Sequence, residues 1–294
     1  MLPILEASGL KVEQDFFLCH SPERVDPGNK RYTTKNTNKV IGGVGPRSLE
    51  LGLEFYSRTI DHMIPVSSAR AAEMVKVFEN TYRAVNIALV NELALLCDRM
   101  ELNVWEVLDA AFTKPFGIQP FYPGPGVGGH CIPLDPHYLE WKAREYNFTT
   151  RFIGLAGEIN RKMPEFVRDK AIRVLNLDGK SASRSQVLLL GVTYKKDLSD
   201  CRESPALEVA ALLLKTGVQL SIHDPLIPSI VIEGKTLQSV PLDEETVRAA
   251  DLVVITTDHS CIDYNWLVQQ SKRVLDTRNA TKRVADPEKK VVLL

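Results

Sequence analysis

Apolar and polar positions follow three different patterns along this chain, and the first covers residues 1–66. Short apolar runs alternate there with turns, which predicts strands at residues 16–19, 39–43 and 62–66 and a helix at residues 46–57. Interleaved strands and helices are typical of an α/β sheet, but this segment holds too few of them to complete one. We therefore interpret residues 1–66 as the last part of a larger domain.

The second pattern, over residues 67–165, is helical. Apolar side chains recur every three or four positions between residues 67 and 100 and predict a single helix about 50 Å long at 1.5 Å per residue. Lys76 and Asn80 lie four positions apart and therefore project from one face, either as part of a solvated surface or as a functional pair. A helix of this length could also form the core of a dimer. Shorter helices are expected at residues 104–111, 138–146 and 153–163.

The third pattern, over residues 166–294, alternates strands with helices. Apolar runs predict strands at residues 186–192, 219–224, 250–256 and 273–276, and a helix with Pro205 near its start lies between the first two. This alternation implies right-handed crossovers and a doubly wound parallel sheet covered on both faces. Ligands of such sheets bind beyond the carboxyl ends of the strands, where these side chains would lie: Tyr194, Lys195, Asp224, Asp258, Thr277 and Arg278.

Composition excludes several classes of protein. The 294 residues carry a net charge of -1 and no basic stripe, so the chain is not expected to bind nucleic acid. We identify no signal peptide and no apolar segment long enough to span a membrane. The 5 cysteines are widely and irregularly spaced, which argues against a disulfide framework and for a reducing, cytoplasmic location.

Residues 121–137 contain the most informative feature, a single cysteine at the end of a loop rich in glycine and proline. The glycines allow the backbone to approach a ligand closely and to adopt positive φ, and the prolines restrict the loop before binding. Cys131 is a candidate nucleophile, which requires a neighbouring group that favours the thiolate. A metal site built from His130, Cys131, Asp135 and His137 is not expected, because their spacing matches no common zinc pattern.

No dinucleotide-binding fingerprint is present. The glycines of residues 124–129 lack a preceding strand and the required spacing, and Gly191 stands alone after its strand.

Five motifs nevertheless occur in an order that resembles a known family. They are His20-Ser-Pro-Glu-Arg24, Glu73-Met-Val-Lys76 with Glu79-Asn80-Thr-Tyr82, Gly126-Val-Gly-Gly-His-Cys131 with Asp135, Gly191-Val-Thr-Tyr-Lys195 with Asp200-Cys-Arg202-Glu-Ser204, and Asp276-Thr-Arg278. Together they resemble the nucleotide-sugar 6-dehydrogenases, the family of UDP-glucose, UDP-N-acetylglucosamine and UDP-N-acetylmannosamine dehydrogenases. The resemblance covers the chain from about residue 1 to about residue 280.

The resemblance implies an α/β protein of three parts. Residues 1–66 would be the C-terminal remnant of an NAD-binding Rossmann domain, residues 67–165 a central long-helix dimerisation domain with the cysteine, and residues 166–294 a Rossmann-like domain that binds the UDP-sugar. Most of the N-terminal domain would then be missing, and we interpret the chain as a truncated form. A homodimer formed through the central helix is implied as well.

The chemistry implied by the resemblance is a four-electron oxidation without a metal. The C6 hydroxymethyl of a UDP-sugar would become a uronate at the expense of two NAD molecules, through a thiohemiacetal and a thioester on Cys131. Lys76 and Asn80 would stabilise charge on the sugar oxygen, and Glu23 would activate the hydrolytic water, although it could simply be a surface acid. Asp135 would orient Lys76 or the water, or, because Pro136 follows it, would only shape a turn.

The resemblance also assigns binding roles. Gly128 would face the sugar and the diphosphate, and Lys195 would contact the nucleotide. Arg202 would reach the NAD pyrophosphate, unless it only forms an ion pair with Asp200 or Glu203. His130 and His137 are expected to pack or form hydrogen bonds and are given no part in proton transfer.

The identity of the sugar is the least determined part of the sequence interpretation. The cysteine segment and residues 21–28 resemble the N-acetylhexosamine members more than the UDP-glucose members, so UDP-N-acetylglucosamine is the first choice and UDP-N-acetylmannosamine the next. The product would serve polysaccharide biosynthesis. A protein of another class, a non-catalytic module that binds a nucleotide sugar or dimerises, remains an alternative.

Overall fold

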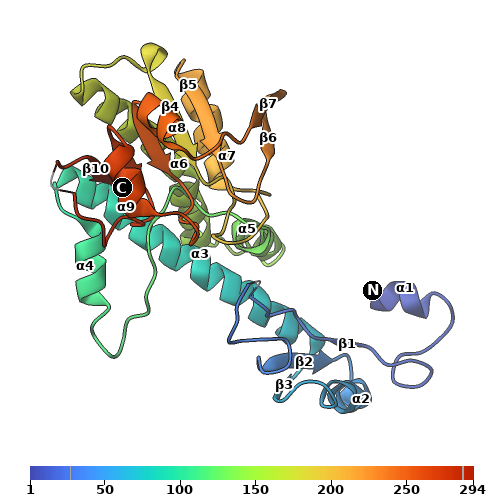
Figure 1. Cartoon of the computed structure of the whole chain (residues 1–294). Helices are drawn as coiled ribbons and strands as arrows, with labels where there is room; N and C mark the ends of the chain where they lie inside the picture. Colours follow the sequence, from blue (N-terminus) through green and yellow to red (C-terminus); the bar gives the residue numbers. More distant parts are fainter. Residues whose placement is uncertain (27, 287) are drawn as a thin grey trace. The chain divides into compact units, whose positions relative to one another are not determined.

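The computed structural model describes residues 1–26, 28–286 and 288–294. These residues form two compact units, Met1–Tyr82 and Arg83–Leu294, each with its own internal packing. Figure 1 shows the order of the helices and strands along the chain. The α/β class predicted from the sequence is confirmed, and the division into three domains stays a prediction.

The first unit contains a small mixed sheet covered by a helix. Strands β1 (Cys19–His20), β2 (Lys39–Gly43) and β3 (Met63–Val66) lie in the order β1-β2-β3, antiparallel in the first pair and parallel in the second. Helix α2 (Pro46–Tyr56) packs closely because Gly52 has no side chain: a Cβ there would lie 2.7 Å from Ile41 Cδ1. A short helix, α1 (Leu2–Glu6), precedes the sheet. The strand predicted at residues 16–19 is largely wrong, because pairing with β2 begins only at Cys19.

The predicted long helix is present as α3 (Ala69–Arg99), which has 31 residues and runs through the division between the units. Small or apolar residues on one face, among them Ala84, Ala88, Ala94 and Cys97, are buried. In the second unit α3 is followed by α4 (Val104–Ala111), whose first turn is capped by the Asn103 side chain, which accepts hydrogen bonds from backbone N–H groups.

Two helices begin or end differently from the sequence prediction. Helix α5 (Cys131–Arg144) begins seven residues before the expected Tyr138, and α6 (Arg151–Leu177) continues past the expected end at residue 163. Both differences involve prolines. The first N–H groups of a helix have no acceptor within it, so Pro133 fits the first turn of α5, while Pro136 and Pro164 are accepted inside their helices at the loss of one backbone bond each.

A five-stranded parallel sheet forms the centre of the second unit. Its strands are β4 (Gln186–Leu190), β5 (Gln219–His223), β8 (Leu252–Ile255), β9 (Val274–Asp276) and β10 (Val291–Leu293), in the order β10-β9-β8-β4-β5. Alternate residues of β4 enter different cores: Val187 and Leu189 pack with α6 and α7 (Pro205–Lys215), and Leu188 and Leu190 pack with α8 (Glu244–Ala249) and α9 (Tyr264–Gln270). The doubly wound sheet is thereby confirmed.

Some elements of the second unit are not apparent in the apolar pattern. The hairpin of β6 (Ser229–Ile232) and β7 (Lys235–Gln238), the helices α8 and α9 and the edge strand β10 were not predicted. A short 3-10 helix, η1 (Ala182–Arg184), lies in the polar connection before β4. Within the described part of the chain no helix is both long enough and apolar enough to cross a membrane.

Candidate active site

Cys131 is the first residue of α5 and is exposed to solvent. Asp135 follows four positions later, so both side chains project from the same face of the helix at its N-terminal end. The idea that Asp135 only shapes a turn beside Pro136 is wrong, because both residues lie inside the helix. Cysteine and carboxylate are therefore held one helical turn apart by regular backbone.

Residues 112–130, which we call the cysteine loop, connect α4 to α5 without a helix or strand. Gly126 and Gly129 adopt φ of 139° and 84°, which confirms the expectation of positive φ in this loop. At Gly128 the close approach is to the protein itself: a Cβ would lie 2.7 Å from Tyr194 Cβ and 2.8 Å from Pro205 Cδ. This packing alone requires a glycine there, and contact with the sugar stays a prediction.

The carboxyl ends of the parallel strands carry the polar side chains that the sequence placed there. Tyr194 and Lys195 follow β4, Asp224 follows β5, and Arg278 follows β9. The backbone N–H groups of Val192 and Thr193 donate to Asp224 Oδ2 at 2.7 and 3.3 Å, and His259 Nε2 lies 3.1 Å from the same oxygen. This fully buried network holds the segment before Lys195, which is half-exposed.

Asp224 stays ionised in this network. Burial raises its pKa, but the hydrogen bonds from His259, Val192 and Leu226 outweigh that effect and lower the pKa below the ordinary value. The sequence interpretation missed His259. An apolar strand that ends in Thr-Thr-Asp-His is a weak signal, and the partner Asp224 lies 35 residues earlier.

Arg202 lies in the exposed connection before α7. Its Nε and Nη2 atoms donate to the Asp200 carboxylate at distances of 2.7 to 3.2 Å, which lowers the pKa of Asp200 to about 2. The ion pair considered from the sequence is therefore present. Nη1 lies outside it, and the contact of Arg202 with NAD stays a prediction.

Glu23, Lys76 and Asn80 belong to the first unit. Glu23 Oε1 accepts hydrogen bonds from the N–H groups of Arg24 and Val25, both at 2.8 Å, and Oε2 lies 3.9 Å from Lys39 Nζ. Partial burial raises the pKa of Glu23, but these bonds and the charges of Lys39 and Lys76 lower it by a larger amount. The net shift of this pKa is therefore downward. Asn80 is buried and Lys76 half-buried on α3. Pro27, within the segment used to choose the sugar, lies outside the described residues.

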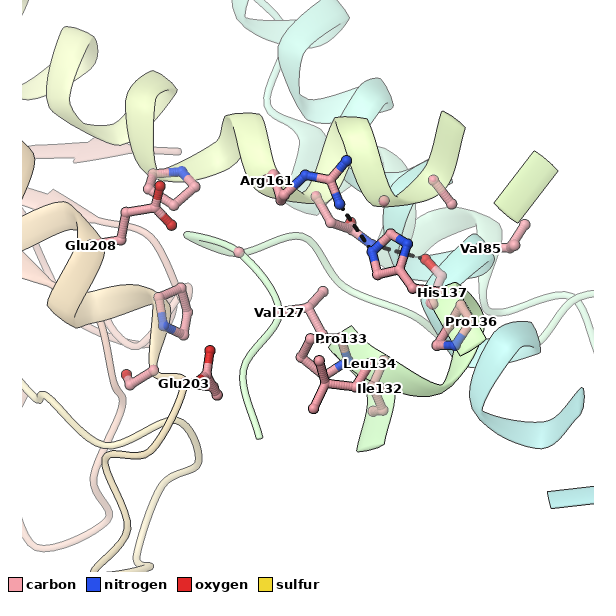
Figure 2. Close-up of a pocket in the computed structure, with 18 of the residues that line it drawn as sticks. Val85, Val127, Ile132, Pro133, Leu134, Pro136, His137, Arg161, Glu203 and Glu208 are labelled. Carbon is pink, nitrogen blue, oxygen red and sulfur yellow. Dashed lines mark hydrogen bonds between the residues drawn. The ribbon is translucent and has the colours of Figure 1, made fainter. Parts of the chain in front are cut away.

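A cavity of about 570 Å³ lies on the opposite face of α5 from Cys131 and Asp135. Figure 2 shows Arg161 and His137 on one side of it and Glu203 and Glu208 on the other. Arg161 Nη1 lies 3.0 Å from His137 Nε2, in agreement with the hydrogen-bonding role expected for this histidine. Burial, followed by the charge of Glu165, raises the pKa of Glu208. Among the described residues, no group of three or more His, Cys, Asp or Glu side chains could hold a metal ion.

Two segments of the chain match models of a known family. Residues 70–162 match the central domain of the UDP-glucose/GDP-mannose dehydrogenase family, and residues 188–283 match the UDP binding domain of that family.

Individual relatives agree with these matches. A UDP-N-acetyl-D-mannosamine dehydrogenase of Methanocaldococcus jannaschii is 35% identical over 284 residues, which are 93% of this chain and 62% of the relative. An NDP-N-acetyl-D-galactosaminuronic acid dehydrogenase of Ralstonia nicotianae is 35% identical over 93% of this chain and 63% of its own length. The solved UDP-D-ManNAc dehydrogenase of Pyrococcus horikoshii aligns with a TM-score of 0.86 at 31% identity, over 99% of this chain and 68% of that one. The chain thus spans about 62% of the length of the first curated relatives.

Proposed function

This chain belongs to the UDP-glucose/GDP-mannose dehydrogenase family, and from that membership we propose that it takes part in the oxidation of a UDP-sugar at C6 to the uronate. Membership confirms the resemblance found in the motifs. The observation that carries the proposal is the exposed Cys131 at the start of α5, with Asp135 one turn later. A free thiol at a helix start, reached by solvent, suits a nucleophile better than a structural cysteine.

We propose that Cys131 holds the sugar covalently between the two oxidations. Its thiolate adds to the C6 aldehyde to give a thiohemiacetal, and loss of two further electrons leaves a thioester, which water hydrolyses to the uronate and the free thiol. NAD, when bound, supplies the electron acceptor. Arg202 is the residue of this chain that would hold it, and an exposed guanidinium suits a pyrophosphate.

Lys76 and Asn80 are proposed to stabilise the negative charge that develops on the C6 oxygen. The burial of Asn80 and the partial burial of Lys76 support this role, because a donor that is shielded from water interacts more strongly with a charge. Glu23 is proposed to accept a proton from the hydrolytic water. Its lowered pKa keeps it ionised at neutral pH and also makes it a weak base, so it would act mainly by orienting water that attacks an already reactive thioester.

UDP-N-acetylmannosamine is now the preferred sugar. The first choice from the sequence, UDP-N-acetylglucosamine, is not favoured by the relatives, whose names specify N-acetyl-D-mannosamine or N-acetyl-D-galactosaminuronic acid. Lys195 and the half-exposed end of the sheet around it are proposed to bind the nucleotide. Recognition of the acetamido group would depend on a small number of polar contacts.

A homodimer is proposed through α3. Apolar side chains on this helix are exposed at positions four or seven residues apart, with exposed fractions of 62% for Phe78, 40% for Tyr82, 63% for Leu89 and 51% for Leu96. This spacing places them along one face of the helix. An apolar row of this kind supports pairing with a second copy.

Titration calorimetry with UDP-N-acetylmannosamine, together with the absorbance of NADH, tests the proposal. We expect the chain to bind this sugar at least about tenfold more tightly than UDP-N-acetylglucosamine. NADH formation in the presence of NAD would establish catalysis by this chain. Binding without NADH would favour the non-catalytic module, and absence of binding to any UDP-sugar would overturn the proposal.

A further inference from the structure

We propose that two buried amides, Asn91 on α3 and Asn160 on α6, form a relay that positions the cysteine loop and, through it, Cys131. Neither asparagine belongs to the motifs that carry the chemistry. The inference depends on the proposed function only in that Cys131 is taken as the nucleophile. Both are positioning residues, which act through the loop and not on the substrate.

The relay consists of three hydrogen bonds in series. Asn91 Oδ1 accepts from the Gly124 N–H at 3.0 Å, and Asn91 Nδ2 donates to Asn160 Oδ1 at 2.9 Å. Asn160 Nδ2 then donates to the backbone carbonyl of Ala84 on α3 at 3.1 Å. The exposed fractions of Asn91 and Asn160 are 0% and 9%, so water competes little for these bonds.

The two ends of the relay fix the orientation of both side chains. A backbone N–H can only donate, so Asn91 must present its oxygen to Gly124 and its nitrogen to Asn160. Asn160 must therefore present its oxygen to Asn91, which leaves its nitrogen for the Ala84 carbonyl, a group that can only accept. Reversal of either amide would bring like groups together at both of its contacts.

Gly124 is in close contact with Arg278 as well as with the relay. A Cβ at Gly124 would lie 2.7 Å from Arg278 Nη1, and Arg278 Nε donates to the Thr256 carbonyl at 2.9 Å. Prolines at 123 and 125 limit rotation of the backbone next to the fixed amide. Fixing this single amide therefore restrains the segment that leads to Cys131, which begins α5 seven residues later.

Amide hydrogen exchange of the intact chain, followed by NMR, tests the relay. Asn91→Leu removes the acceptor of Gly124, and Asn160→Leu removes only the second member, whose side chain bonds to Asn91 and to the Ala84 carbonyl. We expect both variants to accelerate exchange at Gly124 by about tenfold or more relative to the amides of β4. Both substitutions interrupt the same series of hydrogen bonds. The exchange rate at Gly124 in the double variant should therefore exceed that of the faster single variant by less than about twofold.

The matched control is Asn176→Leu, an exposed asparagine on the same helix as Asn160, which should leave Gly124 unchanged. Alkylation of Cys131 by iodoacetamide, measured by mass spectrometry against the exposed Cys261 as an internal standard, should differ from the parent chain by about threefold or more in both relay variants. Since this readout needs neither substrate nor NAD, it remains valid even if the proposed function fails.

Several outcomes would overturn the relay. The relay would be contradicted if Asn160→Leu left exchange at Gly124 unchanged, or if the effects of the two substitutions on that exchange were strictly additive. It would also be contradicted if the ratio of Cys131 to Cys261 alkylation did not change. If a variant only lost stability, hydrogen exchange of the β4 amides would accelerate as much as exchange at Gly124, which would also contradict the relay. If the leucine variants do not fold, the unmodified chain still tests the relay, because rapid exchange of its Gly124 amide would exclude a persistent bond to Asn91.

Discussion

Cys131 owes its exposure to its place at the first position of a helix. A side chain at that position has no preceding helical turn to cover it. The carboxylate of Asp135 follows one turn later along the helix. The sequence identified the cysteine by its motif but described its surroundings as a loop. The difference matters because a helix gives Cys131 and Asp135 a fixed spacing, which a loop would not.

Replacement of this cysteine tests the covalent mechanism. With Cys131→Ser we expect uronate formation to fall by at least about 10³-fold, because an alcohol is a poor substitute for a thiolate, while binding of the UDP-sugar is retained. Uronate release by catalytically active protein measures the first effect. Titration calorimetry measures the binding of the UDP-sugar.

The exposed Cys261 provides the matched control, since Cys261→Ser removes a thiol of similar accessibility in the turn after β8. Its activity should stay within about twofold of the parent. An undiminished rate in the Cys131 variant would end the covalent mechanism.

At the scale of elements, regular periodicity was predictive and prolines were misleading. The spacing of apolar residues gave α3 and the central strands closely, because their burial follows directly from one face or from a continuous run. It failed for the start of α5 and for the second half of α6, where Pro133, Pro136 and Pro164 normally mark helix ends. Tertiary packing of these helices outweighs the local preference.

The amino ends of β4 and β8 are tied together by Asp251. Its carboxylate accepts hydrogen bonds from Lys180, from the Gln186 N–H at 3.0 Å and from Lys272 at 3.1 Å. Burial raises the pKa of Asp251, but these bonds lower it to about 2 overall. A folded-state pKa below the ordinary value means stabilisation that is complete above about pH 4 and is lost as the pH falls toward 2.

We therefore expect Asp251→Asn to lower the free energy of unfolding by about 1–2 kcal/mol at pH 7 and to have little effect near pH 2. Urea denaturation at both pH values measures this. The control is Glu54→Gln, an exposed acid paired with Arg58 on α2, which should change the free energy by less than about 0.5 kcal/mol. An equal loss at both pH values would show that the carboxylate charge is not the cause.

At the scale of the whole molecule, motif order was more informative than composition. Composition and charge only excluded classes of protein, and the expected cytoplasmic location stays a prediction. The five ordered motifs indicated the family that the comparisons establish. The Asn91–Asn160 relay could not be predicted, because its members lie 69 residues apart in the sequence. Each of them alone is only a polar residue within a helical segment.

The proposed dimer is also testable at this scale. Leu89→Lys places a charge in the exposed apolar row of α3, and we expect it to weaken association at least about tenfold by sedimentation equilibrium. Leu177→Lys, at the exposed end of α6, should leave association unchanged. A parent chain that sediments only as a monomer would refute the dimer directly.

Pro164 gives the longest helix of the second unit an unusual chemical property. Lacking an N–H, it cannot complete the bond to the Asn160 carbonyl four residues earlier, so that oxygen loses its usual helical donor. Asn160 lines the cavity behind α5, and its carbonyl would lie 3.6 Å from a Cβ built on Gly126. This turn of α6 therefore carries a backbone acceptor without its usual helical donor, beside a wall made largely of prolines and aliphatic side chains.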